Sequence, residues 1–210
     1  MGKKRPELSN KPAERSNKRK KDTREQKVIL IVCLGQCTEK TYFESFETDE
    51  AQVVVTATHK SPSHLIGYAQ RYIKTNPRKY IDVWLVFDQD NFKKDGDISK
   101  AFQKAKAARF KIAYSVKQFE HWLLLHFGPY SDLMLKEDYQ TKLDVHWNEL
   151  FKRPYQKEKL TQEECKQLDR AQLTAIKNAQ CLKAGGDPSS TVWQLVEILR
   201  ELRPPNSPPC

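Results

Sequence analysis

Residues 83–90 are Val-Trp-Leu-Val-Phe-Asp-Gln-Asp, an apolar run of strand length that ends abruptly in two carboxylates. This stretch is the strongest indication of the fold in the sequence. A run this short is typical of a strand that is covered on both faces, as the central strands of a parallel sheet are. Residues 28–33 have the same character and lead into a turn that contains Gly35. The two runs predict the central strands of one parallel sheet.

Strand-like segments recur outward from these runs, and each is followed by a segment compatible with a helix. They begin about 25 to 30 residues apart, which suits a strand, a helix and two loops. Thr38 and Ser61 are predicted to cap the first two helices. The alternation predicts an α/β fold of Rossmann-like type, with a mostly parallel sheet flanked by helices. The predicted strands are residues 28–33, 52–57, 82–87 and 110–114.

The second half of the chain is predicted to be helical, since strand signals fade after residue 129. Thr161 and Glu164 match a capping box that opens one helix ending at Gly185. A last helix follows residues 187–189. We therefore divide the chain into a disordered basic tail, an α/β core, a helical extension packed on the core and a flexible Pro-rich tail. These parts are residues 1–27, 28–128, 129–203 and 204–210.

The formal charge of +10 is concentrated at the N-terminus. Lys and Arg total 37 against 27 Asp and Glu, yet residues 1–27 alone hold 11 basic and 4 acidic residues, a net charge of +7. This segment has few large apolar side chains, so burial could not offset its ordering entropy. Its basic run is either an arm that binds nucleic-acid phosphates or a solubilising tail. The run consists of Lys18, Arg19, Lys20 and Lys21.

Two classes of protein are disfavoured by the sequence. The longest apolar run, residues 28–34, is far shorter than the roughly 20 residues of a transmembrane helix, and no secretory signal is evident. We therefore expect no membrane association and a cytoplasmic location. Five cysteines, an odd number in a chain of this length, favour free thiols over a disulfide framework. Cys33 and Cys37 lack a second cysteine pair for zinc and are expected to be buried or partly buried structural thiols.

Asp88 and Asp90 are the sharpest candidates for chemistry. Ligands bind at the carboxyl ends of strands in α/β sheets, and two carboxylates at positions i and i+2 of an extended segment point the same way. Carboxylate oxygens suit hard cations such as magnesium. The alternative is a polar turn after a buried strand. Glu39 either favours a helix dipole or points to the same sheet edge.

Glu120 lies in a strongly apolar segment, residues 117–127. A carboxylate in such surroundings requires a partner, either a basic side chain or a metal. His121 and His126 are five residues apart, roughly 140° around a helix, so they are not expected to share a metal. His126 is expected to be an ordinary structural histidine.

Basic and aromatic side chains are interleaved between residues 147 and 157. They could stack on bases and contact phosphates, or they form a helical surface whose cations extend into solvent. These residues are Trp147, Phe151, Lys152, Arg153, Tyr155 and Lys157.

Together these segments resemble the RloB-like family. Beyond the basic tail, the resemblance rests on residues 29–43, 83–90, 113–115, 119–127 and 188–192, and Phe-Glu-His-Trp-Leu-Leu-Leu-His-Phe at 119–127 is its most specific part. The family is similar to Toprim-fold proteins and is associated with prokaryotic abortive-infection and anti-phage systems, often beside an ABC-type ATPase. The resemblance therefore implies a Toprim-like fold and a metal-dependent role in cleaving nucleic acid.

One position departs from that pattern. Toprim-type sites place a glutamate directly before the glycine that follows the first strand, as a general acid or base or as a metal ligand, and here the residue is Leu34. Glu39, which matches the family's second glutamate, could partly compensate.

Two hypotheses follow. In the first, the protein is a nuclease of RNA, including transfer RNA, or of DNA. Asp88, Asp90 and Glu120 would then hold Mg²⁺ or Mn²⁺, and Glu39 would join these three as a catalytic residue. In the second, it is a catalytically impaired module that binds nucleic acid or an ATPase partner.

Overall fold

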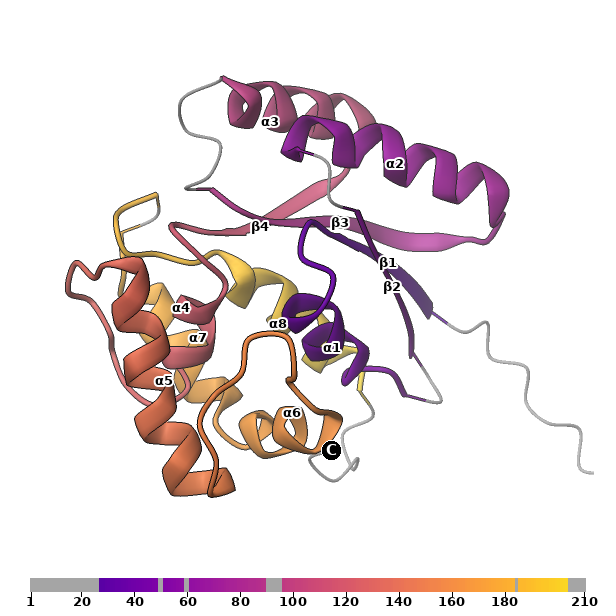
Figure 1. The fold of residues 1–210 in the computed structure, drawn as a ribbon. Coiled ribbons are helices and arrows are strands. Elements are labelled where there is room, and N and C mark those ends of the chain that lie inside the picture. Colours follow the sequence, from indigo (N-terminus) through magenta and orange to yellow (C-terminus); the bar gives the residue numbers. More distant parts are fainter. Residues whose placement is uncertain (1–26, 49–50, 59–60, 90–95, 184, 204–210) are drawn as a thin grey trace, which may run out of the picture.

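The computed structural model describes residues 27–48, 51–58, 61–89, 96–183 and 185–203. Within them, four strands form one sheet in the order β2-β1-β3-β4, and every pair is parallel. This confirms the prediction of an α/β protein with a parallel sheet flanked by helices (Figure 1). The strands are β1 (Lys27–Cys33), β2 (Ala51–Ala57), β3 (Tyr80–Asp88) and β4 (Lys111–Ser115).

The helices divide unequally between the two faces of the sheet. Figure 1 shows α2 and α3 side by side on one face, whereas α1 and the helices after β4 lie on the other. The helices are α1 (Thr38–Glu44), α2 (Pro62–Thr75), α3 (Asp97–Ala108), α4 (Glu120–Leu124), α5 (Lys136–Phe151), α6 (Gln162–Asp169), α7 (Gln172–Gln180) and α8 (Val192–Glu201).

The continuous apolar sequence of β1 follows from this double coverage. Ile29 and Ile31 belong to the apolar cluster beneath α1 and the later helices, while Leu30 and Val32 belong to the cluster beneath α2 and α3. All four side chains are fully buried. Because successive side chains of a strand point to opposite faces, an inner strand covered twice needs apolar residues at every position.

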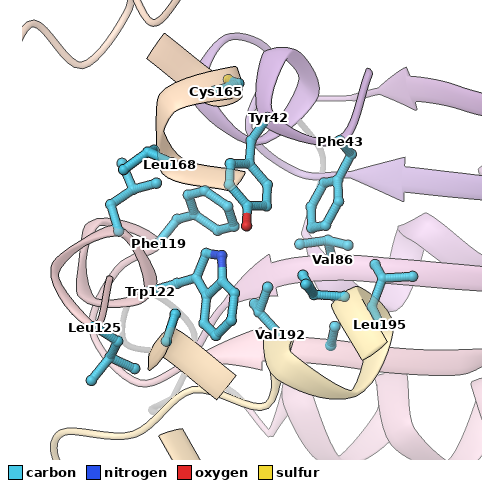
Figure 2. Close-up of a cluster of buried hydrophobic side chains, with 14 of the residues drawn as sticks. Tyr42, Phe43, Val86, Phe119, Trp122, Leu125, Cys165, Leu168, Val192 and Leu195 are labelled. Atoms are coloured by element: carbon cyan, nitrogen blue, oxygen red, sulfur yellow. The ribbon is translucent and has the colours of Figure 1, made fainter. Parts of the chain in front are cut away.

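The larger apolar cluster is organised around Tyr42. Its ring meets Phe43, Phe119 and Trp122 edge to face, with ring centroids 5.3, 5.6 and 6.4 Å away (Figure 2). Leu168 of α6 and Leu195 of α8 belong to the same cluster. Residues on both sides of position 129 thus contribute to one apolar cluster, and the domain boundary there stays a prediction.

The long helix predicted from Thr161 to Gly185 is wrong, since α6 ends at Asp169 and α7 begins at Gln172. At the break, the amides of Arg170 and Ala171 bond to carbonyls three residues back instead of four. Asp169 is held there by Arg203, with an N–O distance of 2.7 Å. A tertiary ion pair therefore fixes a corner that helical periodicity does not reveal.

The predicted helix starts were correct in two of three cases. Ser61 is the N-cap of α2, and Thr161 and Glu164 form the predicted capping box of α6. Thr38 does not cap α1. It is instead the first helical residue, and its hydroxyl donates to the carbonyl of Lys157.

The segment before α8 runs along the edge of the sheet. Ser115 and Ser190 form an antiparallel bridge, and their hydroxyls lie 3.0 Å apart. Thr191 adds two bonds to Tyr114: its amide donates to the Tyr114 carbonyl at 2.8 Å and its hydroxyl accepts from the Tyr114 amide at 2.9 Å. This pairing ties the C-terminal helices to β4.

The cysteines of the described ranges are all free, as predicted. Cys33 and Cys165 are buried, whereas Cys37 and Cys181 are exposed. The expectation that Cys37 is at least partly buried is therefore wrong, because the turn after β1 carries it to the surface. In the same ranges no helix combines the length and the apolar content needed to cross a bilayer.

Candidate functional site

The candidate site lies where the order of the strands reverses. The chain passes from β1 to β2 on one side of β1, and then to β3 on its other side. In open parallel sheets, the crevice outside the carboxyl ends of two such strands is where ligands bind. The turn after β1 and Asp88, the last residue of β3, border this crevice.

Glu39 reaches the crevice from the first turn of α1 and is 7% exposed. Its carboxylate lies directly over Gly35, where any Cβ atom would overlap it. Glycine in this turn therefore leaves room for the Glu39 carboxylate, which would have to shift if a larger residue stood here. Of the two interpretations of Glu39, this position favours the sheet edge.

Glu120 enters from the first residue of α4 and is 2% exposed. The hydroxyl of Tyr155 donates to one carboxylate oxygen at 3.1 Å, and the ammonium of Lys157 donates to the other at 3.1 Å. The prediction that Glu120 has a partner is confirmed, and that partner is a basic side chain. Thr38 holds the Lys157 backbone against α1.

Burial and neighbouring carboxylates raise the affinity of Asp88 and Glu39 for protons. Burial raises the pKa of Asp88 well above its ordinary value, and repulsion from Glu39 and Glu120 raises it further, with Lys157 opposing them. The pKa of Glu39 is also raised, chiefly by burial and in part by Glu120. Three carboxylates from three elements thus act on one another, and among the described residues Lys157 and Lys136 oppose the rise in the pKa of Asp88 without cancelling it.

The donor chemistry of this cluster suits a hard divalent cation, since carboxylate oxygens are the ligands that Mg²⁺ and Mn²⁺ prefer. Glu120 is already ion-paired, so Glu39 and Asp88 are the fitting donors among the described residues. In that part of the chain, no three His, Cys, Asp or Glu side chains are grouped closely enough to hold a metal. Asp90, predicted as the companion ligand of Asp88, lies outside the described residues, as do Lys18, Arg19, Lys20 and Lys21.

Leu34 does not face the carboxylates. Its side chain packs against the apolar cluster beneath α2 and α3, and its amide donates to the carbonyl of Val86 at 2.9 Å. Cys33, one residue earlier, belongs to the apolar cluster on the opposite face. Its pKa is raised, chiefly by burial and in part by the charge of Glu39. Position 34 therefore belongs to the other side of the sheet in this chain.

The interpretation of residues 147–157 as a stacking surface for nucleic acid is wrong. Trp147 and Tyr155 are buried, and Arg153 pairs with Glu164 at 2.5 Å. Lys157 instead contributes to the carboxylate site, a position that its sequence surroundings did not indicate. The sequence indicated only that Glu120, a carboxylate in an apolar segment, required a basic or metal partner, and did not identify Lys157 as that partner.

The two histidines of α4 and its C-terminal end lie in apolar surroundings. Burial lowers the pKa of both His121 and His126 to about 4, so both are neutral near pH 7. His126 contacts the Tyr42 hydroxyl at 3.4 Å and the Trp122 carbonyl at 3.1 Å. These contacts confirm it as a structural histidine.

Comparison with known proteins gives one match. The model of the RloB-like protein family matches residues 29–199, which is most of the chain and includes every described carboxylate of the site. No curated protein and no solved structure matches the chain.

Proposed function

The chain belongs to the RloB-like family, and from the carboxylates of this member we propose that it is a metal-dependent nuclease of RNA or DNA. The observation that carries the proposal is the convergence of Glu39, Asp88 and Glu120, from three separate elements, at the point where the strand order reverses. The raised pKa values of Asp88 and Glu39 mean that their charged forms cost folding free energy near neutral pH. A cation held by these two carboxylates would offset that cost.

The roles of the residues follow from their surroundings. Asp88 and Glu39 would hold the cation, which when bound supplies Lewis-acid polarisation of a phosphate and a lowered pKa of water. Glu39 has a raised pKa, which brings it nearer to the pH at which a carboxylate both accepts and returns a proton. The side chain of Lys157 is 54% exposed although it pairs with Glu120, so its ammonium is accessible to a phosphate oxygen.

A second candidate function is favoured by position 34. A chain with Leu34 turned away from the site, and with Glu120 already paired, would bind nucleic acid or an ATPase partner without cleaving it. Both candidates are compatible with the role in anti-phage defence, often beside an ABC-type ATPase, that the family resemblance implies.

The decisive experiment is a cleavage assay on the full chain. Transfer RNA, other RNA and DNA are incubated with Mg²⁺ or Mn²⁺ and, separately, with chelator. We expect cleavage only with the metal, and a loss of about 100-fold or more in Asp88→Asn, on the scale reported for groups that stabilise a transition state directly. The exposed Asp132→Asn variant is the control for charge and should cleave normally.

The same assay separates the two candidates. Cleavage that persists unchanged in Asp88→Asn contradicts the proposed site. If the natural chain cleaves nothing while Leu34→Glu gains metal-dependent cleavage, the impaired module is the correct description. A folded Leu34→Glu variant without any gain would show that position 34 is not the missing group.

A further inference from the structure

A groove lies between α2 and α3. These two helices cover the face of the sheet opposite to the other helices (Figure 1). Its volume is about 470 Å³. Arg71 and Lys104 line it from opposite helices, both exposed, together with His64 and Gln70. No acidic residue is among the side chains that line it. The groove therefore has an apolar floor with cationic and polar side chains along it, and it has no role in the chemistry proposed above.

The groove also lies where the basic charge of the folded part is concentrated. Residues 61–89 and 96–111, which the structure describes, hold 9 basic and 3 acidic residues, a net charge of +6, whereas residues 129–203 hold 12 of each. Two of the acidic side chains already have partners: Asp82 forms an ion pair with Lys111 at 2.8 Å, and Asp97 accepts a hydrogen bond from the amide of Ser63 at 2.9 Å. Beyond the N-terminal tail, this layer therefore carries the main positive field.

Gly67 is the second feature of the groove. A Cβ atom there would meet nothing nearer than a guanidinium nitrogen of Arg71, at 3.8 Å. Alanine would thus fit, and in the interior of a helix it is favoured over glycine by about 1 kcal/mol. Glycine at this position keeps the groove open beside Arg71.

The direction of the groove connects it with the carboxylates. Helix α2 follows β2 and helix α3 follows β3, so both begin at the carboxyl edge of the sheet, the edge that bears Asp88. Ser63 and His64 line the groove from the first turn of α2, at this edge. Arg71 lies two turns further from the edge. One end of the groove therefore lies at the edge of the sheet that bears Asp88, although Glu39 and Glu120 reach this edge from the opposite face.

We propose that this α2–α3 groove binds the sugar-phosphate backbone of nucleic acid and guides it to the carboxylate edge, an inference that rests on the proposed function. The guanidinium of Arg71 and the ammonium of Lys104, which line the groove from opposite helices, suit phosphates, and each phosphate they neutralise releases counterions. Apart from the imidazole of His64, the lining has no aromatic ring on which a base could stack. Binding is therefore to the backbone and independent of base sequence.

The test measures binding without cleavage. Fluorescence anisotropy of labelled RNA and DNA oligonucleotides is followed with the full chain in chelator, between about 50 and 200 mM salt. Arg71→Gln/Lys104→Gln should weaken binding about tenfold at low salt and reduce the slope of log K against log salt by about 1.5. Lys166→Gln/Lys177→Gln removes the same charge from exposed positions of α6 and α7, and should leave both quantities unchanged.

A second variant tests the shape of the groove. Gly67→Glu fills it and adds a negative charge while all cations remain, so it should weaken binding at least as much as the double variant. Circular dichroism confirms that each variant is folded. Equal loss in the two double variants, or unchanged binding in Gly67→Glu, would overturn the proposal. So would binding of anionic lipid vesicles or polyglutamate that is as tight as that of nucleic acid and equally sensitive to Arg71 and Lys104.

Different results would contradict the groove proposal and the nuclease proposal. Asp88→Asn should bind nucleic acid in chelator as well as the natural chain does, because the carboxylate opposes phosphate. If Asp88→Asn still cleaves, the nuclease site is wrong while the groove can stand. If Arg71→Gln/Lys104→Gln binds normally, the groove is wrong while the carboxylate site can stand.

Discussion

Glu164 and Asp88 are both carboxylates withdrawn from water, but their surroundings differ. Glu164 is 3% exposed and receives hydrogen bonds from the Trp147 indole at 2.8 Å and the Thr161 amide at 2.9 Å, and it pairs with Arg153 at 2.5 Å. Asp88 is half-buried at the end of β3. The charges of Glu39 and Glu120 raise its pKa, and those of Lys157, which is paired with Glu120, and Lys136 lower it.

The difference separates structure from function in this chain. A buried carboxylate that has its own donors holds elements together, as Glu164 joins α5, α6 and the segment between them. A carboxylate placed among others lowers stability, so its presence calls for another explanation. Removing the carboxylate should therefore lower the free energy of unfolding at Glu164 and raise it at Asp88.

The largest effect is expected at Glu164. Glu164→Ala leaves Arg153 and the Trp147 indole without their acceptor, and should lower the free energy of unfolding by about 3–5 kcal/mol. Chemical denaturation measures this loss. Glu163→Ala, the exposed neighbour on α6, should change stability by less than about 0.5 kcal/mol. Equal losses of unfolding free energy in Glu164→Ala and Glu163→Ala would contradict the structural role assigned to Glu164.

A smaller loss is expected at the turn under Glu39. Gly35→Ala places a Cβ atom where the Glu39 carboxylate lies, which should cost about 1–3 kcal/mol and abolish metal-dependent cleavage. In a Glu39→Ala background the collision is absent. The stability cost of Gly35→Ala should then disappear in a double-mutant cycle. A cost that persists would show that the backbone of the turn, rather than Glu39, requires glycine.

Asp88→Asn should stabilise the metal-free protein, by on the order of 1 kcal/mol, or about 2–4 °C in Tm. The raised pKa of Asp88 means that the folded state binds a proton more tightly than the unfolded chain. The natural chain therefore loses stability relative to Asp88→Asn as pH rises from the unfolded pKa, about 3.9, through the raised folded pKa. Melting curves in chelator should show that the difference in Tm between Asp88→Asn and the natural chain is largest at neutral pH and disappears near pH 4. Asp132→Asn should show no such difference.

The smallest effect is a gain in the outer layer. Gly67→Ala should raise the free energy of unfolding by about 0.5–1 kcal/mol, because the added Cβ atom meets no close neighbour within a regular helix. Gly96→Ala is the contrasting control, since the backbone of Gly96 has a φ of 61° that favours glycine, and it should destabilise. Destabilisation by Gly67→Ala would mean that α2 and α3 pack more tightly than the groove indicates.

The sheet was predictable because its signals are local. The strands predicted at residues 82–87 and 110–114 are observed as Tyr80–Asp88 and Lys111–Ser115, within two residues at each end. A strand buried on both faces must be apolar throughout, so its position follows from the sequence alone. The crevice at its carboxyl end follows from the same topology.

The remaining features depend on partners that are distant in sequence. Lys157 pairs with Glu120, 37 residues earlier, and no pattern around Lys157 indicates this. Asp169 ends α6 where Arg203 of the C-terminal segment reaches it, so an apparently continuous helix becomes two. Gly35 is required by the position of a side chain, which only the folded chain reveals.

The measurement that tests the central claim most directly is the melting temperature of the natural chain and of Asp88→Asn with and without Mg²⁺ or Mn²⁺. In chelator the natural chain should melt below Asp88→Asn. Saturating metal should raise the Tm of the natural chain, since a ligand that binds only the folded state stabilises it, and should leave Asp88→Asn nearly unchanged. No shift in the natural chain, or an equal shift in both proteins, would contradict a cation site at Asp88.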